Sequence, residues 1–332
     1  MSSSFPRAHP GYLNIPSKPN APISYSFFPA TTSPPTTVSY DTLIVFVNGL
    51  GLPAASWIPT IASLQSYLVG ACPALLTYDR FGQGLTTARD PSDGQKGKEL
   101  GHDLIDVAND LHEIILATAA SNFGLQSTAV ENGKLHLLLV CASVGAPIAR
   151  LYVQNHQGIV SGMIFLDSNI ANVNYSDFLP DPDSPGFDKN ALHLDDCTLE
   201  EYRESRTKLS RMFDLKVKNP ESLDRTSSPS LLPYSNKPKL VGTDHSGPLL
   251  SVVGHDPETF AELSYEMMGT PRSLSRITNG YWAEYNENLT QITDKEKCKG
   301  VVIAKGCGHF IQRDDPAFVA KQISSMAKEL GW

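Results

Sequence analysis

A serine stands between an apolar run and a helical pattern, in a stretch of small residues. Residues 135–140 are apolar and long enough for a strand buried on both faces, and residues 144–152 place apolar side chains on one helical stripe. Ser143 lies between them in Cys-Ala-Ser-Val-Gly, residues 141–145. A tight strand-to-helix turn exposes the hydroxyl and directs the first helical N–H groups toward whatever it attacks. We therefore predict Ser143 as a nucleophile, the alternative being an ordinary strand–helix junction.

A serine hydroxyl needs a base within hydrogen-bond reach and a third group that orients this base. His309 is the leading base, because it follows an expected strand at 300–304 and two glycines, and comes last in the chain. His255 also follows an expected strand and is the main rival. The histidines expected inside a strand or on helices are His136, His102, His112 and His156.

Two aspartates are candidates for the orienting acid. Asp167 ends the apolar run at 163–166, and Asp256 follows the run at 249–253. Asp256 is followed by Pro and Glu, which is also how a helix begins, with Asp as its cap. An aspartate at a strand end often only ties a loop, so the residues alone leave both acids open.

Strand and helix patterns alternate along most of the chain. This alternation predicts an α/β fold with a mostly parallel central sheet covered by helices on both faces. Ligands of such sheets gather at the carboxyl ends of the strands, where all the candidates above lie. An edge strand is expected at 23–28 and a loop at 30–37. The other expected strands are 42–47, 75–78, 135–140, 163–166, 249–253 and 300–304, with helices at 102–116, 144–152, 281–289 and 318–330.

Composition changes after Asn169, where aspartates and prolines become frequent. Thr198 and Glu201 form a capping box that predicts the start of a helix. Because long excursions in compact domains are usually functional, we interpret 169–247 as an inserted cap or lid. Residues 1–168 and 248–332 would then form the core, the alternative being a long surface excursion.

Composition excludes several classes of protein. Of 332 residues, 41% are hydrophobic and 19% charged, which is typical of a globular enzyme. The net charge of -8 and the lack of a basic cluster argue against a nucleic-acid partner. No apolar run is long enough to span a membrane, and the first residues lack the apolar core of a signal peptide. Five cysteines without metal-type spacing favour a cytoplasmic protein with free thiols.

With these motifs in this order, the chain resembles the α/β-hydrolase superfamily, and within it fungal-type small-molecule hydrolases. The matching segments are 48–51 (Asn-Gly-Leu-Gly), 79–84, 141–145 and 306–316. Asn48 stands where relatives commonly have His, and Cys141 where they have Gly. The resemblance implies an oxyanion hole made by the N–H groups of Leu50 and Val144, and substrate contacts at Asn48 and Gly49.

The same resemblance implies a Ser143–His309–acid triad. The segment before the last strand, from Trp282, resembles a subgroup that uses the earlier acid, which favours Asp167 over Asp256. The implied activity is hydrolysis of an ester, lactone or similar acyl bond in a small, fairly apolar molecule, with no metal or organic cofactor. Alternatives are a cyclase that forms a lactone and a non-catalytic small-molecule receptor. Epoxide and haloalkane chemistry is disfavoured, because it needs a carboxylate at position 143. The sequence leaves the oligomeric state open.

Overall fold

The computed structural model describes residues 8–31, 40–68, 72–188 and 190–332. The loop expected at 30–37 and the first residues of the chain lie largely outside these ranges. Eight strands form one sheet in the order β1-β2-β4-β3-β6-β7-β9-β10. β1 and β2 form an antiparallel hairpin that pairs antiparallel with β4, and the remaining pairs are parallel. The strands are β1 His9–Ile15, β2 Lys18–Phe28, β3 Asp41–Val47, β4 Ala74–Tyr78, β6 Leu135–Ala142, β7 Val160–Leu166, β9 Leu249–His255 and β10 Cys298–Ala304.

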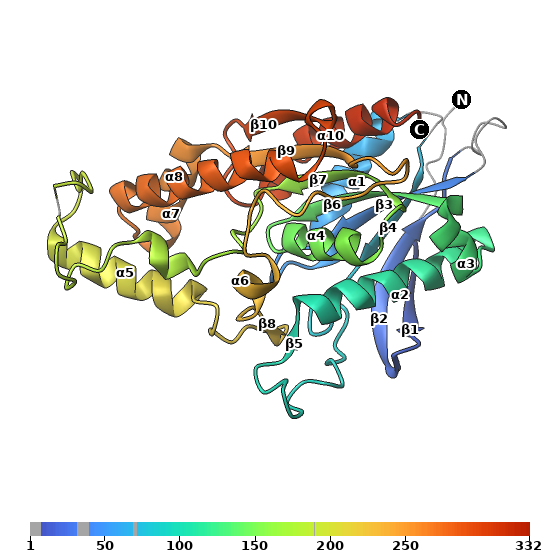
Figure 1. Ribbon diagram of the computed structural model, residues 1–332, viewed down its shortest axis with the longest axis horizontal. Coiled ribbons are helices and arrows are strands. Elements are labelled where there is room, and N and C mark those ends of the chain that lie inside the picture. The colour runs from blue at the N-terminus through green and yellow to red at the C-terminus, as the bar shows by residue number, and fades with distance from the viewer. Residues whose placement is uncertain (1–7, 32–39, 69–71, 189) are drawn as a thin grey trace.

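The sheet is covered on both faces because its central strands are apolar on both sides. In β3, Val45 points into one core cluster and its neighbour Phe46 into the other. Helices α2 (Leu104–Phe123), α4 (Gly145–Asn155) and α8 (Arg272–Leu289) contribute to the first cluster. Helices α1 (Ile58–Tyr67) and α10 (Pro316–Glu329) contribute to the second (Figure 1). The predicted α/β fold with a mostly parallel, helix-covered sheet is confirmed.

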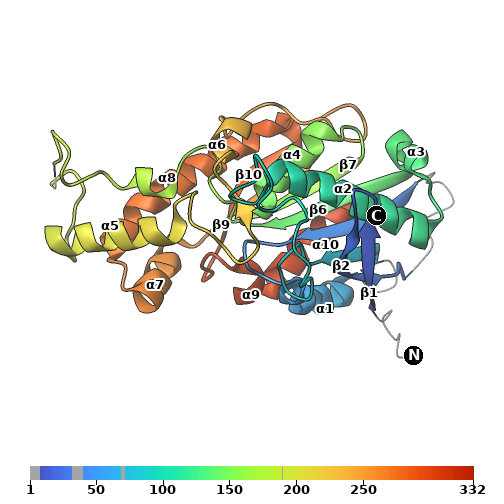
Figure 2. The same ribbon diagram turned by 90° about the horizontal axis from the view of Figure 1, so that it is seen from below.

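A lobe extends beyond the sheet and carries α5 (Leu199–Phe213), α7 (Pro257–Met268) and the first turns of α8 (Figure 2). Its small core joins Leu179, Tyr202 and Leu209 to Leu274 of α8. The lobe therefore uses chain from both sides of residue 247. Residues 169–247 also contribute to the first core cluster of the sheet, through Ile170, Ala171, Phe178, Leu223, Leu232 and Leu240. The division into core and cap stays a prediction.

The helix expected at 102–116 begins at Leu104, because the Asp103 carboxylate caps it by accepting the N–H groups of Ile105 and Asp106. His102 is therefore not helical: it lies in β5 (His102–Asp103), which pairs with β8 (Leu223–Asp224). No helix in the described ranges is both long and apolar enough to cross a bilayer. Short helical segments are α3 Ser127–Ala129, α6 Ser228–Leu231, α9 Ile311–Asp314, and the turns Ala54–Trp57, Val130–Lys134, Tyr175–Phe178, Thr290–Ile292 and Lys295–Lys297.

Candidate active site

Ser143 occupies a strained turn between β6 and α4. Its φ of 52° lies in the left-handed region that non-glycine residues rarely adopt. The turn is held by the Ser143 N–H, which donates to the Leu166 carbonyl at 3.0 Å. A side chain at Gly145 would place its Cβ 2.5 Å from the Val47 carbonyl oxygen, so only glycine fits there. The local geometry is that of the predicted elbow.

Cys141 is the first residue of the turn segment Cys-Ala-Ser-Val-Gly. Its side chain is fully buried and belongs to the core cluster that α4 covers. Burial raises the pKa of the Cys141 thiol well above its usual value, so the thiol stays protonated. Cys141 is a packing residue beneath the elbow, and its thiol has no thiolate chemistry at neutral pH.

The structure brings Ser143, His309 and Asp167 together from the ends of three different strands. The Ser143 hydroxyl lies 3.0 Å from His309 Nε2, and His309 Nδ1 lies 2.5 Å from Asp167 Oδ2. Asp167 follows β7 directly, with a φ of 46°, and its N–H donates to the Val253 carbonyl at 2.8 Å. The candidate nucleophile, base and orienting acid thus form a continuous hydrogen-bonded chain.

The Asp167 carboxylate is fully buried and serves two histidines. Oδ2 accepts from His309, and Oδ1 accepts from the His255 ring at 2.8 Å. Burial by itself raises the pKa of Asp167, but the charge and hydrogen bond of His255 and the hydrogen bond of His309 outweigh this and lower the pKa to about 2. The carboxylate is therefore ionised throughout the neutral range.

Asp256, the rival acid, is a helix cap. Its Oδ1 accepts the N–H groups of Glu258 and Thr259 at the start of α7, and its Oδ2 accepts the N–H of Gly306. These three N–H donors lower the pKa of Asp256, with Gly306 contributing most. His255, the rival base, contacts Asp167 and not Ser143.

The loop after β3 passes beside the nucleophile. A Cβ built on Gly49 would lie 3.4 Å from Ser143 Cβ, which is ordinary contact distance. Among hydrogen bonds within the described ranges, neither Leu50 nor Val144 donates its backbone N–H to a protein acceptor. Val144 precedes the first residue of α4, where N–H groups lack helical partners. Their role as oxyanion donors stays a prediction.

The side chain of Asn48 is committed to the protein. Its Oδ1 accepts from Trp57 Nε1 at 2.7 Å, and its Nδ2 donates to the Tyr78 carbonyl and to Gln83, both at 2.8 Å. Only 1% of Asn48 is exposed. This geometry indicates that the Asn48 side chain holds the loop in place. It does not favour the substrate contact that the sequence predicts for this side chain. A contact of Gly49 with substrate stays a prediction.

Comparisons with known proteins place the fold. The family model described as "Alpha/beta hydrolase family" matches residues 44–322. The chain belongs to this family. Membership supports hydrolysis as the general class of reaction. No curated protein matches the sequence. Within the described part of the chain, no group of three or more His, Cys, Asp or Glu is arranged to hold a metal ion.

Solved structures share the hydrolase fold at low sequence identity. The peroxisomal alpha-beta-hydrolase Lpx1 from Saccharomyces cerevisiae is 13% identical, with a TM-score of 0.51 over 100% of this chain and 88% of that one. A thermophilic esterase from Thermogutta terrifontis is 16% identical, with a TM-score of 0.51 over 97% and 99%. MenH from S. aureus is 14% identical, with a TM-score of 0.51 over 93% and 99%. At such identities the likeness shows the fold alone.

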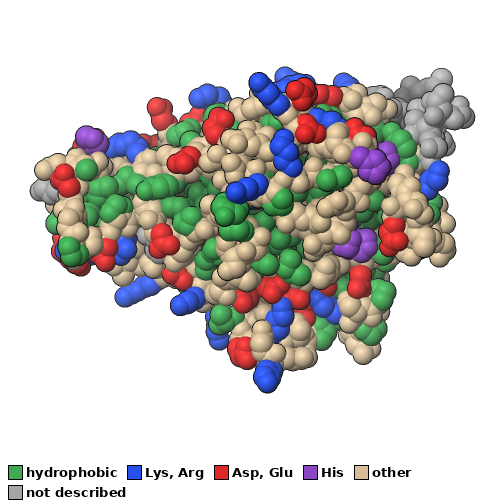
Figure 3. Space-filling model, in the orientation of Figure 1, with side chains coloured by type: hydrophobic (Ala, Val, Ile, Leu, Met, Phe, Trp, Pro, Cys, Tyr) green, Lys and Arg blue, Asp and Glu red, His purple; other side chains and the backbone are tan. Residues whose placement is uncertain are grey.

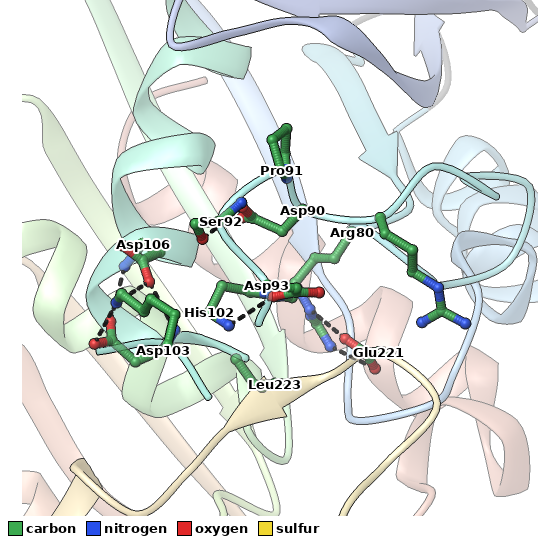
Figure 4. Close-up of polar contacts among 12 residues, drawn as sticks. Arg80, Asp90, Pro91, Ser92, Asp93, His102, Asp103, Asp106, Glu221 and Leu223 are labelled. Carbon is green, nitrogen blue, oxygen red and sulfur yellow. Dashed lines mark hydrogen bonds and ion pairs between the residues drawn. The ribbon is translucent and has the colours of Figure 1, made fainter. Parts of the chain in front are cut away.

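In this hydrolase, a buried ion pair joins the loop beside Ser143 to the segment before β8 (Figure 4). Arg80 Nε donates to Glu221 Oε2 at 2.9 Å, and only 3% of Arg80 and 0% of Glu221 are exposed. The guanidinium also donates to the carbonyls of Asn48 and Gly49, at 2.7 and 3.0 Å. The Glu221 carboxylate accepts the N–H of Gly51 as well. Arg80 and Glu221 therefore fix the backbone of the predicted oxyanion loop.

Sequence reasoning did not find Glu221. Arg80 lay in a matched motif, but its partner is 141 positions away in a region without a recognisable pattern. The available signal was weak: a glutamate in a segment otherwise crowded with polar residues. A buried carboxylate cannot be distinguished from a solvated one without knowing which loop passes beside it.

Aromatic rings extend from His309 into the lobe. The Trp282 ring lies 5.7 Å from the His309 ring, between centroids, and 6.2 Å from Tyr175. Tyr175 in turn contacts Phe213 at the end of α5, at 5.1 Å. The Trp282 Nε1 donates to the Ser168 carbonyl, which fixes the ring next to the acid. In this hydrolase, apolar and aromatic side chains thus lie on one side of the candidate base His309.

Proposed function

We propose that the protein is a serine hydrolase that cleaves an ester, lactone or similar acyl bond through an acyl-enzyme on Ser143. The observation that carries this proposal is the hydrogen-bonded chain from Ser143 Oγ through His309 to Asp167, at 3.0 and 2.5 Å. A serine becomes a useful nucleophile when a histidine can take its proton and a buried carboxylate orients that histidine. Both conditions are supported by these distances and by the burial of Asp167.

In this mechanism His309 Nε2 accepts the Ser143 proton while Oγ attacks the acyl carbonyl. The N–H groups of Leu50 and Val144 hold the oxyanion, and removal of one such donor typically costs about 3 kcal/mol of transition-state stabilisation. His309 then gives its proton to the leaving group. Water, activated by the same nitrogen, releases the acid and restores Ser143.

We propose a small and fairly apolar substrate. The rings of Trp282 and Tyr175 support this, because they form an aromatic chain from the candidate base toward the lobe. Tyr175 also packs against the lobe core, whose partly buried apolar side chains include Phe187, Phe213 and Ile277. Apolar surroundings of this kind favour an acyl or alkyl group over a charged substrate.

A fluorophosphonate probe, which labels activated serines, tests the proposal. We expect labelling of the wild type and hydrolysis of p-nitrophenyl butyrate, with both lost in Ser143→Ala. Ser66→Ala is the matched control, because Ser66 is exposed on α1. Wild-type protein that is folded yet neither labelled nor active would contradict the proposal and favour a small-molecule receptor.

The same triad supports one further outcome. If a hydroxyl of the substrate, instead of water, attacks the acyl-enzyme, the product is a lactone. Incubation of a hydroxy-ester in ¹⁸O-water with product analysis by mass spectrometry distinguishes the two reactions. We expect ¹⁸O in the released acid. A lactone without ¹⁸O would assign the protein as a cyclase.

The cytoplasmic location stays a prediction.

A further inference from the structure

His255 is buried next to the acid and has a hydrogen-bond partner on each ring nitrogen. Nδ1 lies 2.8 Å from Asp167 Oδ1, and Nε2 lies 3.0 Å from Asn279 Oδ1. Only 4% of His255 is exposed. A neutral imidazole has one donor and one acceptor nitrogen, so the nature of these two partners decides the charge of the ring.

The orientation of the Asn279 amide follows from its other contact. Its Nδ2 donates to the Pro257 carbonyl at 2.9 Å, and a carbonyl oxygen can only accept. The reverse orientation would put two acceptor oxygens at that distance with no proton between them. Oδ1 of Asn279 therefore faces His255 as an acceptor, and His255 Nε2 must donate to it.

Both ring nitrogens of His255 thus donate, one to a carboxylate and one to an amide oxygen. We propose that His255 is a resident imidazolium that neutralises Asp167 and so lowers the proton affinity of His309. Its effect on rate rests on the proposed function, whereas its charge does not. His255 and Asn279 are positioning residues, because neither reaches Ser143.

The surroundings of His255 support a cation. Burial lowers the pKa of His255, but Asp167, the Asn279 oxygen and Asp256 more than offset this, so that the pKa lies above its usual value. The ring stacks on Phe260 of α7 at 4.3 Å, a contact that attracts a cation. The groups that face it are Asp167 from β7, Asp256 beside it, His309 across Asp167, Phe260 from α7, and Asn279 and Trp282 from α8.

A neutralised Asp167 has a specific consequence for His309. A bare carboxylate would stabilise an imidazolium at His309 strongly. With His255 charged, the Asp167–His255 pair has no net charge, so it stabilises that imidazolium less than a bare carboxylate would. The acid limb of the pH–rate profile therefore moves to higher pH when the charge of His255 is removed.

NMR of protein labelled with ¹⁵N-histidine tests the charge directly. We expect both ring nitrogens of His255 to be protonated at pH 7, where an ordinary histidine is mostly neutral. The signals are assigned by their loss in His255→Asn. In Asn279→Leu, Nε2 should lose its proton at this pH. Asn288→Leu, the same change elsewhere on α8, is the control and should leave the His255 signals unchanged.

The second readout is the rate of fluorophosphonate labelling of Ser143 against pH. His255→Asn keeps an N–H near Asp167 Oδ1 but carries no charge, so we expect its acid limb about one pH unit above that of the wild type. Asn279→Leu should move the limb in the same direction and provides the measurement if His255→Asn does not fold. Asn288→Leu should keep the wild-type limb.

The two readouts separate the two proposals. A neutral His255 ring in the wild type at pH 7 overturns the inference. A charged ring with an unmoved acid limb in both variants overturns the effect on His309. Absence of wild-type labelling would contradict the proposed function, while the NMR measurement would still decide whether His255 is charged.

Discussion

Asp167 and Asp256 are both ionised carboxylates close to the last strand, yet they have different partners. Asp167 accepts from two histidine rings and is fully buried. Asp256 accepts from three backbone N–H groups at the start of α7 and in the loop after β10. The partners, and not the position at a strand end, decide which carboxylate can orient a base. The triad role of Asp167 is a prediction that substitution tests.

Asp167→Asn should lower kcat for p-nitrophenyl butyrate by about 10⁴-fold, because an amide does not hold the reactive tautomer of His309. Asp256→Asn should lower kcat less than about threefold and mainly reduce the melting temperature, since it weakens the cap of α7. Steady-state kinetics and thermal unfolding of both variants measure this. A greater loss of kcat in Asp256→Asn would reassign the acid.

Local patterns at single residues were informative where one residue type serves one geometry. The small residues around Ser143 and the Asp-Pro-Glu start of α7 predicted the turn and the cap correctly. The second histidine on Asp167 was not predicted. The sequence indicates His255 only as a rival base, because its adjacency to Asp167 arises from the pairing of β7 with β9, which a single sequence does not display.

At the scale of elements, the Arg80–Glu221 pair connects three segments: the loop after β3, the loop after β4 and the segment before β8. If either Arg80 or Glu221 were replaced by a neutral residue, the other would stay buried with an uncompensated charge, which is costly in a protein interior. The pair therefore makes the position of the oxyanion loop depend on a residue from the predicted cap.

Glu221→Gln tests this dependence. We expect a loss of about 3 kcal/mol in the free energy of unfolding, because Arg80 stays buried without its counter-charge. Labelling of Ser143 should slow by about 10- to 100-fold as the loop shifts. Urea unfolding and probe kinetics measure the two effects.

Glu200→Gln is the matched control. Its partner Arg203 lies at 2.8 Å, but the Glu200 side chain is 69% exposed. We expect a change of at most about 0.5 kcal/mol there and unchanged labelling. Equal effects of the two substitutions would show that the buried pair does not support the loop.

Most of the sheet could be predicted because its strands are continuous apolar runs. The expected strands at 42–47, 75–78 and 135–140 lie within β3, β4 and β6. The strand at 9–15 was missed, because β1 is a partly exposed edge strand with polar residues and weak alternation. The predicted helix at 281–289 is the end of α8, whose earlier turns pack in the lobe.

For the whole molecule, the described residues form one core cluster on each face of the sheet and a smaller one in the lobe. Helix α5 buries only Tyr202 and Leu209, whereas nearly every side chain of α4 is buried. Figure 3 shows hydrophobic side chains reaching the surface along the lobe. Exposed large apolar residues of α5, α7 and α8 are Met212, Tyr265, Met267 and Tyr281. The lobe helix α5 therefore buries less apolar surface than the sheet-covering helix α4.

Hydrogen exchange should reveal this difference. We expect amides of α5 to exchange at least about tenfold faster than those of α4, because local opening costs least where few apolar contacts are lost. Mass spectrometry of peptides from 199–213 and 145–155 measures the rates, and comparison of two helices removes the contribution of helical hydrogen bonding. Equal protection would mean that lobe and sheet open as one unit.

Glu221 also constrains how this protein can be re-engineered. A chimera that received its residues 169–247 from another family member would bury the Arg80 guanidinium against foreign chain. Unless the transplanted segment supplied a carboxylate at the position of Glu221, the chimera would lose both folding stability and activity. This loss would not depend on the substrate of the protein that supplied the segment. Exchange of specificity by segment grafting therefore requires this glutamate to be carried along with the new lining.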